Sequence, residues 1–208
     1  MIILGARGHA IEVLEVLNNI EESGLYFYDD VNKDIPARLF NRYPILRLES
    51  EAIEHLRLDA RIVIGIGNGK LREQLAARAI SWGGVLHTVI APNARIGRYQ
   101  VTLGAGLNVM DGVLISNETT VGEGSLINAR AVLHHNVSVG RYCEVSPGAQ
   151  LLGHVQLGDY SQVGAGAIIL PNITIGKEAT IGAGAVVTRN IGDFELVAGV
   201  PARALRKK

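Results

Sequence analysis

Two adjacent histidines, His134 and His135, are the residues of this 208-residue chain best suited to move a proton near neutral pH. An imidazole titrates close to neutrality and can act as a general base, which typically contributes about 10²–10⁴-fold to a rate. The same side chain is common on protein surfaces, and the residues alone leave both interpretations open. No acidic residue recurs with this pair at a metal-ligand spacing, so we predict no metal site.

A six-residue repeat must position these histidines. From Leu103 to Val187 every sixth residue is Leu, Ile or Val, over 15 consecutive positions. This spacing does not fit a helix and is typical of a solenoid whose coil has three flat faces of one hexad each. Three hexads close a coil of 18 residues, so residues 18 apart stack on one another. Aliphatic residues then form the core, which explains an aromatic content of only 5%.

Cys143 lies eight residues after His135, which invites a covalent acyl-enzyme mechanism. It occupies the fifth position of its hexad, where other hexads commonly hold Ala or Ser, so a small packed thiol is the better interpretation. A single cysteine excludes an intramolecular disulfide framework and fits a reducing compartment. With no apolar stretch of about 18 residues to span a membrane, we expect a cytoplasmic location.

The charge distribution separates two parts of the chain. Overall, 20 basic and 20 acidic residues balance, which gives no reason to expect a nucleic-acid or membrane partner. Residues 1–88, however, carry 22 charged side chains and residues 102–190 carry 10. We therefore place a domain boundary between these two segments.

The front segment alternates apolar runs at 1–4, 25–28 and 61–66 with stretches of helical spacing. This alternation predicts a small α/β, Rossmann-like domain with a parallel sheet. Ligands bind beyond the carboxyl ends of parallel strands, where glycine and polar residues should converge here. These candidate ligand residues are Gly5, Arg7, Gly8, His9, Asp29, Asp30, Gly67 and Asn68.

Two chemical roles are open to these residues. The turn from Gly5 to Gly8 lacks the three-glycine dinucleotide fingerprint, so we do not predict NAD binding, but its amides can receive a phosphate. Asp29 and Asp30 could accept hydrogen bonds from a pyrimidine N–H and a ribose, or they could be a solvated pair that ends a strand.

The chain resembles the sialic acid O-acetyltransferase family and its relatives, the bacterial nucleotide-4-amino-sugar N-acetyltransferases, which are hexapeptide-repeat acyltransferases. The resemblance rests on Gly5 to His9, Tyr28-Asp29-Asp30, Ile64 to Asn68, Ile127-Asn128 through His135, and Val197 to Arg203. It implies that residues 1–88 bind a nucleotide-sugar and that residues 89–190 form a left-handed parallel β-helix that binds acetyl-CoA. It also implies a C-terminal tail at 191–208 and a homotrimer with active sites between neighbouring β-helices.

The resemblance implies that His135 is the general base. Relatives have Glu or Asp after this histidine, whereas this chain has Asn136. An amide can fix a tautomer but cannot stabilise an imidazolium as a carboxylate can. We therefore hypothesise that Glu144, or His154, which stacks 18 residues after Asn136, positions the base or the sugar. Gly153 stacks on His135, and its N–H is implied to stabilise the oxyanion, although it could simply be a corner glycine.

Acetyl-CoA is implied to lie along the repeats. The candidate residues are Gly153, Ala165 and Ala183. The two alanines sit in Gly-Ala-Gly segments whose exposed backbone could pair with a pantetheine arm, although coil packing would need the same segments. Arg203 and the basic residues 206–208 could meet CoA phosphates or simply be solvated.

From these observations we predict an acetyl-CoA-dependent N-acetyltransferase that acts on a UDP- or dTDP-linked 4-amino-4,6-dideoxy sugar by direct transfer, in bacterial surface-glycan (O-antigen) synthesis. An amine is the better nucleophile and tolerates the weaker base that Asn136 implies. A sugar O-acetyltransferase, a silent β-solenoid scaffold and a nucleotide-binding regulator are the alternatives. The scaffold gives no reason for the histidine pair, and the regulator predicts nucleotide binding without acetyl-CoA binding.

Overall fold

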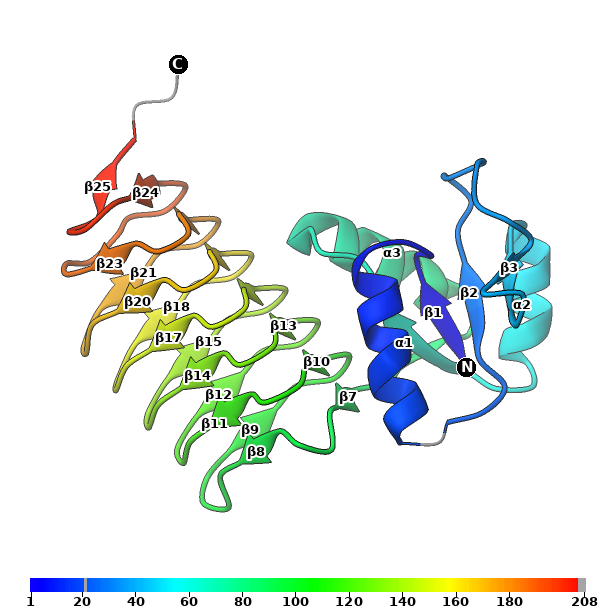
Figure 1. Ribbon diagram of the computed structural model, residues 1–208, viewed down its shortest axis with the longest axis horizontal. Coiled ribbons are helices and arrows are strands. Elements are labelled where there is room, and N and C mark those ends of the chain that lie inside the picture. The colour runs from blue at the N-terminus through cyan, green and yellow to red at the C-terminus, as the bar shows by residue number, and fades with distance from the viewer. Residues whose placement is uncertain (21, 206–208) are drawn as a thin grey trace.

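The computed structural model describes residues 1–20 and 22–205 as an α/β domain followed by a left-handed parallel β-helix (Figure 1). The α/β sheet has the order β3-β4-β2-β1-β5-β6, and only β3 pairs antiparallel. This confirms the predicted Rossmann-like class. The elements are β1 (Ile2–Leu4), α1 (His9–Asn19), β2 (Tyr26–Tyr28), β3 (Arg38–Leu39), β4 (Tyr43–Leu46), α2 (Glu49–Leu56), β5 (Arg61–Ile64), α3 (Gly69–Ser81) and β6 (Val85–Leu86).

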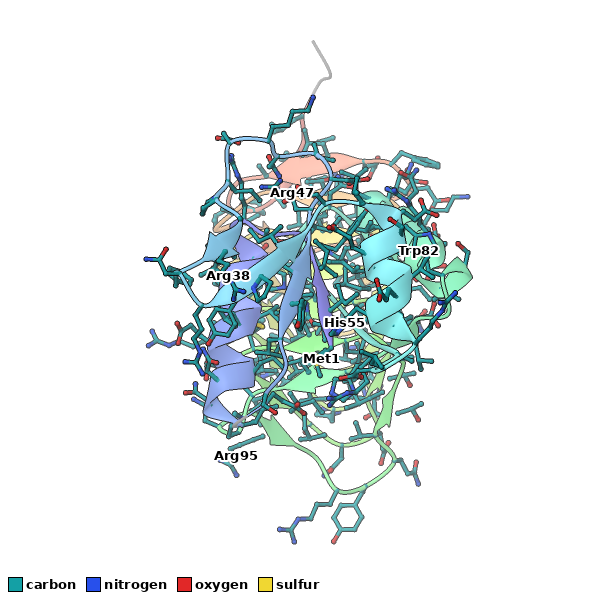
Figure 2. All side chains as sticks on the ribbon, turned by 90° about the vertical axis from the view of Figure 1, so that its right-hand side faces the viewer. Met1, Arg38, Arg47, His55, Trp82 and Arg95 are labelled. Carbon is teal, nitrogen blue, oxygen red and sulfur yellow. The ribbon has the colours of Figure 1, made fainter. Side chains whose placement is uncertain are left out.

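The parallel strands of this domain point their carboxyl ends toward one edge. Figure 2 shows Met1, at the start of β1, below Arg47, which lies near that edge. The Arg47 guanidinium donates to the carbonyls of Asp29, 3.1 Å away, and Ile35, 2.7 Å away. Arg47 thereby holds the loop that follows β2 in place beside the predicted ligand site.

The β-helix consists of three sheets of very short strands, which we number in chain order. The first sheet contains β7 (Val89–Ile90), β10 (Asn108–Val109), β13 (Leu126–Ile127), β16 (Glu144–Val145), β19 (Gln162–Val163), β22 (Thr180–Ile181), β24 (Leu196–Ala198) and β25 (Arg203–Ala204). The second contains β8 (Arg95–Ile96), β11 (Leu114–Ile115), β14 (Val132–Leu133), β17 (Gln150–Leu151), β20 (Ile168–Ile169) and β23 (Val186–Val187). The third contains β9 (Thr102–Leu103), β12 (Thr120–Val121), β15 (Ser138–Val139), β18 (Gln156–Leu157) and β21 (Thr174–Ile175).

The 18-residue stacking predicted from the hexads is the register of these sheets. Val109 pairs with Ile127, and Val145 pairs with Val163. The repeated aliphatic side chains point inward, and together with Cys143 they form the buried core of the β-helix. Each coil turns at three corners, which we call the 1–2, 2–3 and 3–1 corners after the sheets that they connect.

The α/β domain packs against the first sheet and the 3–1 corner of the β-helix. Arg72 of α3 is 1% exposed, and its guanidinium donates to the carbonyls of Gly67, Gly124, Tyr142 and Cys143. A Cβ on Gly69 would lie 2.4 Å from the Tyr142 carbonyl oxygen, so α3 contacts the corner backbone directly. A buried network of hydrogen bonds thus fixes the orientation of the two parts.

The C-terminal segment differs from a simple tail. β24 pairs parallel with β22 and β25 returns antiparallel to β24, so residues expected in the tail extend the first sheet. Arg203 is exposed in β25, whereas residues 206–208 lie outside the described residues. Among the described helices, none combines the length and apolar character needed to cross a membrane.

Candidate active site

His135 lies at the 2–3 corner, in the turn between β14 and β15, and its side chain is exposed. Asn136 completes the turn with a φ of 59°, and its Oδ1 lies 2.8 Å from Nδ1 of His135. If Nδ1 carries the proton, Nε2 keeps its lone pair and can act as a base. The turn therefore presents an imidazole with one nitrogen held and the other free to accept a proton.

Glu118, which the sequence did not single out, forms a hydrogen bond with this turn. The Nδ2 of Asn136 donates to Oε2 of Glu118. Residue 118 lies 18 positions before 136, so the coil arithmetic that related Gly153 to His135 would have found it if applied downward as well as upward. The 2–3 corner thus contains a His135–Asn136–Glu118 array, in which an amide lies between the histidine and the carboxylate.

Gly153 and His154 stack on this array one coil above, as the repeat predicts. A Cβ on Gly153 would lie 2.6 Å from Cε1 and 2.8 Å from Nε2 of His135, so the imidazole occupies the space that any side chain would need. The ring of His154 lies 5.2 Å from that of His135, centroid to centroid, with the planes at 85°. Both residues therefore shape the surroundings of the candidate base.

Glu144 does not join this array within one chain. It lies in β16 of the first sheet, whereas His135 is at the corner between the other two sheets. Its carboxylate accepts a hydrogen bond from Ser146 Oγ at 3.3 Å. The hypothesis that Glu144 positions the base has no support from the contacts of a single chain.

Ala165 and Ala183 lie at the 1–2 corner, on a different edge of the β-helix from His135. They precede Gly166 and Gly184, which turn the corner with a φ of 66°. A surface cavity of about 540 Å³ lies at this corner in earlier coils, lined by residues that include Arg130 and Gly148. The corner offers exposed backbone to a ligand, but a single chain does not bring it to His135.

A second cavity of about 540 Å³ lies at the carboxyl ends of the α/β strands, where the sequence predicts a ligand site. Helix α3 supplies one wall through two leucines, Gln74 and Arg78. The cavity is lined by Gly5, Tyr28, Asp29, Asp30, Val31, Asn32, Ile66, Leu71, Gln74, Leu75 and Arg78. The sequence analysis identified Gly5, Asp29 and Asp30 but missed the α3 residues, because they face the cavity only once α3 is packed on the sheet.

Asp29 stabilises the loop that forms part of this cavity wall. Its side chain is buried and accepts hydrogen bonds from the backbone N–H groups of Ala6, Val31 and Asn32 at 2.8–3.2 Å. Its carboxylate therefore shapes the loop, and its oxygens are already occupied by these donors.

Asp30 is tied to α3. It accepts hydrogen bonds from Arg78 at 2.7 Å and from the Tyr28 hydroxyl at 3.0 Å. Burial alone would raise the pKa of Asp30, but these two hydrogen bonds hold it below its ordinary value. Burial, reinforced by Asp30, raises the pKa of Tyr28 to about 12. Asp30 is therefore ionised and Tyr28 neutral at pH 7, and Arg78 stacks on the rings of Tyr28 and Trp82.

Four other residues predicted to bind a ligand in this domain lie outside the lining of the cavity. Arg7 pairs with Asp34 at the exposed surface, and Gly8 precedes α1 with a φ of 47°. The carbonyl oxygen of Gly67 accepts a hydrogen bond from Arg72, and the Asn68 side chain caps α3 by accepting from the N–H of Leu71. None of these four appears in the lining of the cavity that contains Asp30.

His9 is an interdomain residue. Its Nδ1 lies 3.0 Å from Glu12, and its Nε2 lies 3.0 Å from Nδ2 of Asn108 in β10. Burial lowers the pKa of His9, although the hydrogen bond with Glu12 opposes this effect. The imidazole is therefore neutral at pH 7 and connects α1 to the β-helix.

Cys143 is buried in the core of the β-helix. Burial raises the pKa of Cys143 to about 12, and its thiol donates to the Gly158 carbonyl oxygen at 3.1 Å. A protonated, packed thiol is a poor nucleophile, in agreement with the packing interpretation. Across residues 1–20 and 22–205, no three His, Cys, Asp or Glu side chains group as metal ligands would.

Comparison with known proteins gives a consistent picture. Residues 1–79 match the model of the PglD N-terminal domain, and residues 118–153 and 154–189 match that of the bacterial transferase hexapeptide (six repeats). PerB from Caulobacter crescentus, solved with CoA and GDP-perosamine, is 32% identical, with a TM-score of 0.85 over 99% of this chain and 96% of that one. The chain belongs to the family of hexapeptide-repeat acyltransferases that includes the perosamine N-acetyltransferase of Caulobacter crescentus.

Two further solved relatives support the assignment. The acetyltransferase domain of PglB from Neisseria gonorrhoeae FA1090, in complex with acetyl coenzyme A, is 28% identical with a TM-score of 0.90 over 98% of each chain. WeeI from Acinetobacter baumannii AYE is 26% identical with a TM-score of 0.86, again over 98% of each chain. No curated protein matched the sequence. Membership makes the chain an acyltransferase and agrees with the family suggested by its sequence motifs.

Proposed function

We propose that this acyltransferase moves the acetyl group of acetyl-CoA to the amino group of a nucleotide-linked 4-amino-4,6-dideoxy sugar, with His135 as general base. The observation that carries the proposal is the His135–Asn136 hydrogen bond of 2.8 Å, which leaves Nε2 free at an exposed corner. The relatives that bind CoA or acetyl-CoA, one of them together with GDP-perosamine, support both substrates. Roles in surface-glycan synthesis and in the cytoplasm remain predictions from the resemblance.

The residues at the 2–3 corner fit direct transfer. The sugar nitrogen attacks the thioester carbonyl carbon, a C–N bond forms, and Nε2 of His135 takes the proton that the nitrogen loses. The C–S bond then breaks, and the imidazolium returns the proton to the CoA thiolate. The Gly153 N–H, next to the imidazole, is our candidate donor to the oxyanion. No step needs a covalent enzyme intermediate, which agrees with the protonated thiol of Cys143.

We also propose that the active sites form between copies of the chain in a homotrimer. His135 and Gly153 lie at the 2–3 corner, whereas Ala165 and Ala183 lie at the 1–2 corner of the same prism. One extended acetyl-CoA could contact both sets only if a second copy brings its 1–2 corner to the first copy's 2–3 corner. The exposed Arg203 would then be a candidate for CoA phosphates, and Glu144 and His154 could face the sugar from different copies.

For the nucleotide we propose the cavity of the domain at residues 1–88, with acetyl-CoA bound by residues 89–190. The cavity combines the aliphatic side chains of α3 with the Arg78–Asp30 pair, which suits a flat base and a hydroxylated sugar. The turn that begins at Gly5 lies at its edge. The N–H groups of Gly5 and Ala6 already donate to Tyr28 and Asp29, so the candidate donors to a diphosphate are the N–H groups of Arg7 and Gly8.

The proposed function is tested by thiol release from acetyl-CoA with purified protein. The acceptors are UDP-, dTDP- and GDP-linked 4-amino sugars and free sialic acid, with product analysis by mass spectrometry. We expect rapid release with one amino sugar and acetylation at nitrogen. Acetylation of a hydroxyl, or binding of nucleotide-sugar without acetyl-CoA binding, would contradict the proposal.

Substituting Gly153→Ala should lower kcat by about 100-fold, because a Cβ 2.6 Å from Cε1 of His135 must displace the imidazole and such misplacements are costly. Steady-state kinetics measures the effect. Gly192→Ala is the matched control, since the nearest atom to its Cβ would be 3.6 Å away. Equal activities of the two variants would show that Gly153 does not make room for the base.

Substituting Arg78→Ala should raise KM for the nucleotide-sugar about tenfold and leave KM for acetyl-CoA unchanged. The change removes a charged hydrogen-bond donor from the cavity wall and releases Asp30 and Tyr28. Arg38→Ala, on the edge strand β3, is the control. A rise in KM for acetyl-CoA instead would place the nucleotide elsewhere.

A further inference from the structure

Both polar atoms of the Asn136 side-chain amide make hydrogen bonds. Its Oδ1 lies 2.8 Å from Nδ1 of His135, and its Nδ2 donates to Oε2 of Glu118. Glu118 is exposed, and its backbone adopts the left-handed αL conformation. Its φ of 56° is close to the 59° of Asn136 one coil above. Because both residues occupy the same position of successive coils with the same backbone conformation, their side chains leave the corner in parallel and meet.

We propose that Glu118 is a positioning residue that acts through Asn136 to hold His135 in the tautomer protonated on Nδ1. An ionised carboxylate can only accept hydrogen bonds, so Glu118 requires the NH₂ end of the Asn136 amide. The carbonyl end of the amide must then face His135, where it can only accept. Nδ1 must therefore carry the hydrogen, and the lone pair is left on Nε2.

Without this constraint the amide would have no preferred orientation. An asparagine that is free to flip offers either a carbonyl or an NH₂ group to the imidazole, and the NH₂ group selects the tautomer with hydrogen on Nε2. In that tautomer Nε2 cannot accept a proton from the sugar nitrogen, and the Nδ1 lone pair is engaged by the amide. Glu118 thus supplies orientation that Asn136 alone lacks.

The negative charge of Glu118 also acts on His135 through the Asn136 amide. A carboxylate bonded to the amide polarises it, which makes Oδ1 a stronger acceptor toward an imidazolium that forms during transfer. The neutral residue at position 136 is thereby compensated by a carboxylate one coil below. This compensation rests on the proposed function, whereas the tautomer assignment concerns the free protein and can be measured without substrates.

The kinetic test compares Glu118→Gln in two backgrounds. In the wild-type chain we expect kcat to fall about tenfold or more, within the about 10²–10⁴-fold that a general base contributes. In an Asn136→Asp background, where a carboxylate meets His135 directly, Glu118→Gln should change kcat by less than about twofold. The same factor in both backgrounds would overturn the proposal, because Glu118 would then act independently of residue 136.

The tautomer is read directly by ¹⁵N NMR of the imidazole, with His135→Gln used to assign the signals. We expect hydrogen on Nδ1 in the wild type and a substantial Nε2-protonated population in Glu118→Gln. Glu178→Gln makes the same change at a corner residue with a φ of 55° and should leave the His135 signals unchanged. An unchanged tautomer in Glu118→Gln overturns the inference, whereas an inactive wild type with the expected tautomers would overturn only the proposed function.

Discussion

Replacing His135 by alanine is expected to lower kcat by about 10²–10⁴-fold while the protein still binds both substrates, because the change removes only the group that accepts the proton. The neighbouring His154 ring, 5.2 Å away, is not held by the Asn136–Glu118 pair and should not replace it. Steady-state kinetics gives kcat, and calorimetric titration gives the affinity for acetyl-CoA.

The adjacent histidine provides a control for this variant. His134→Ala changes the same residue type one position away, outside the array, and should leave kcat within the same order of magnitude. Equal losses in the two variants would point to a disturbed corner rather than a lost base. An active His135→Ala enzyme would remove the proposed base outright.

Replacing Arg72 by methionine is expected to destabilise the protein by about 3–5 kcal/mol, because it leaves buried carbonyl groups on both sides of the domain interface without a donor. The side chain is 1% exposed and donates to the carbonyls of Gly67, Gly124, Tyr142 and Cys143. Burial lowers the pKa of Arg72, although the charge of Glu144 opposes this effect. Methionine conserves much of the volume, so the loss reports the hydrogen bonds.

Chemical denaturation of the full chain measures this loss as a lower free energy of unfolding, and separation into two transitions would show that the α/β domain has uncoupled. The control is Arg141→Met, an exposed arginine paired with Asp159, for which we expect a small change. Similar losses for both arginines would contradict the interface role. Because α3 also forms the wall of the nucleotide cavity, KM for the nucleotide-sugar should rise in Arg72→Met.

Particular residues show how far sequence reasoning reaches at this site. The stacking of Gly153 on His135 follows from counting 18 residues, and the structure places the glycine where a Cβ would meet the imidazole. Counting 18 residues down from Asn136 also reaches Glu118, but only the structure shows the hydrogen bond that distinguishes this glutamate from a solvated corner charge. Asp29 looked like a ligand residue, yet its carboxylate is occupied by the backbone of its own loop.

The sequence by itself determined the coils of the β-helix, because the hexad repeat is local and its period sets which residues share a corner. It also predicted that glycine and polar residues gather at the carboxyl ends of the front strands. Only the tertiary structure decided which corner the α/β domain covers and that Arg78 faces the cavity. Those outcomes depend on contacts between distant segments, such as α3 with the Tyr142 corner, and no local periodicity encodes them.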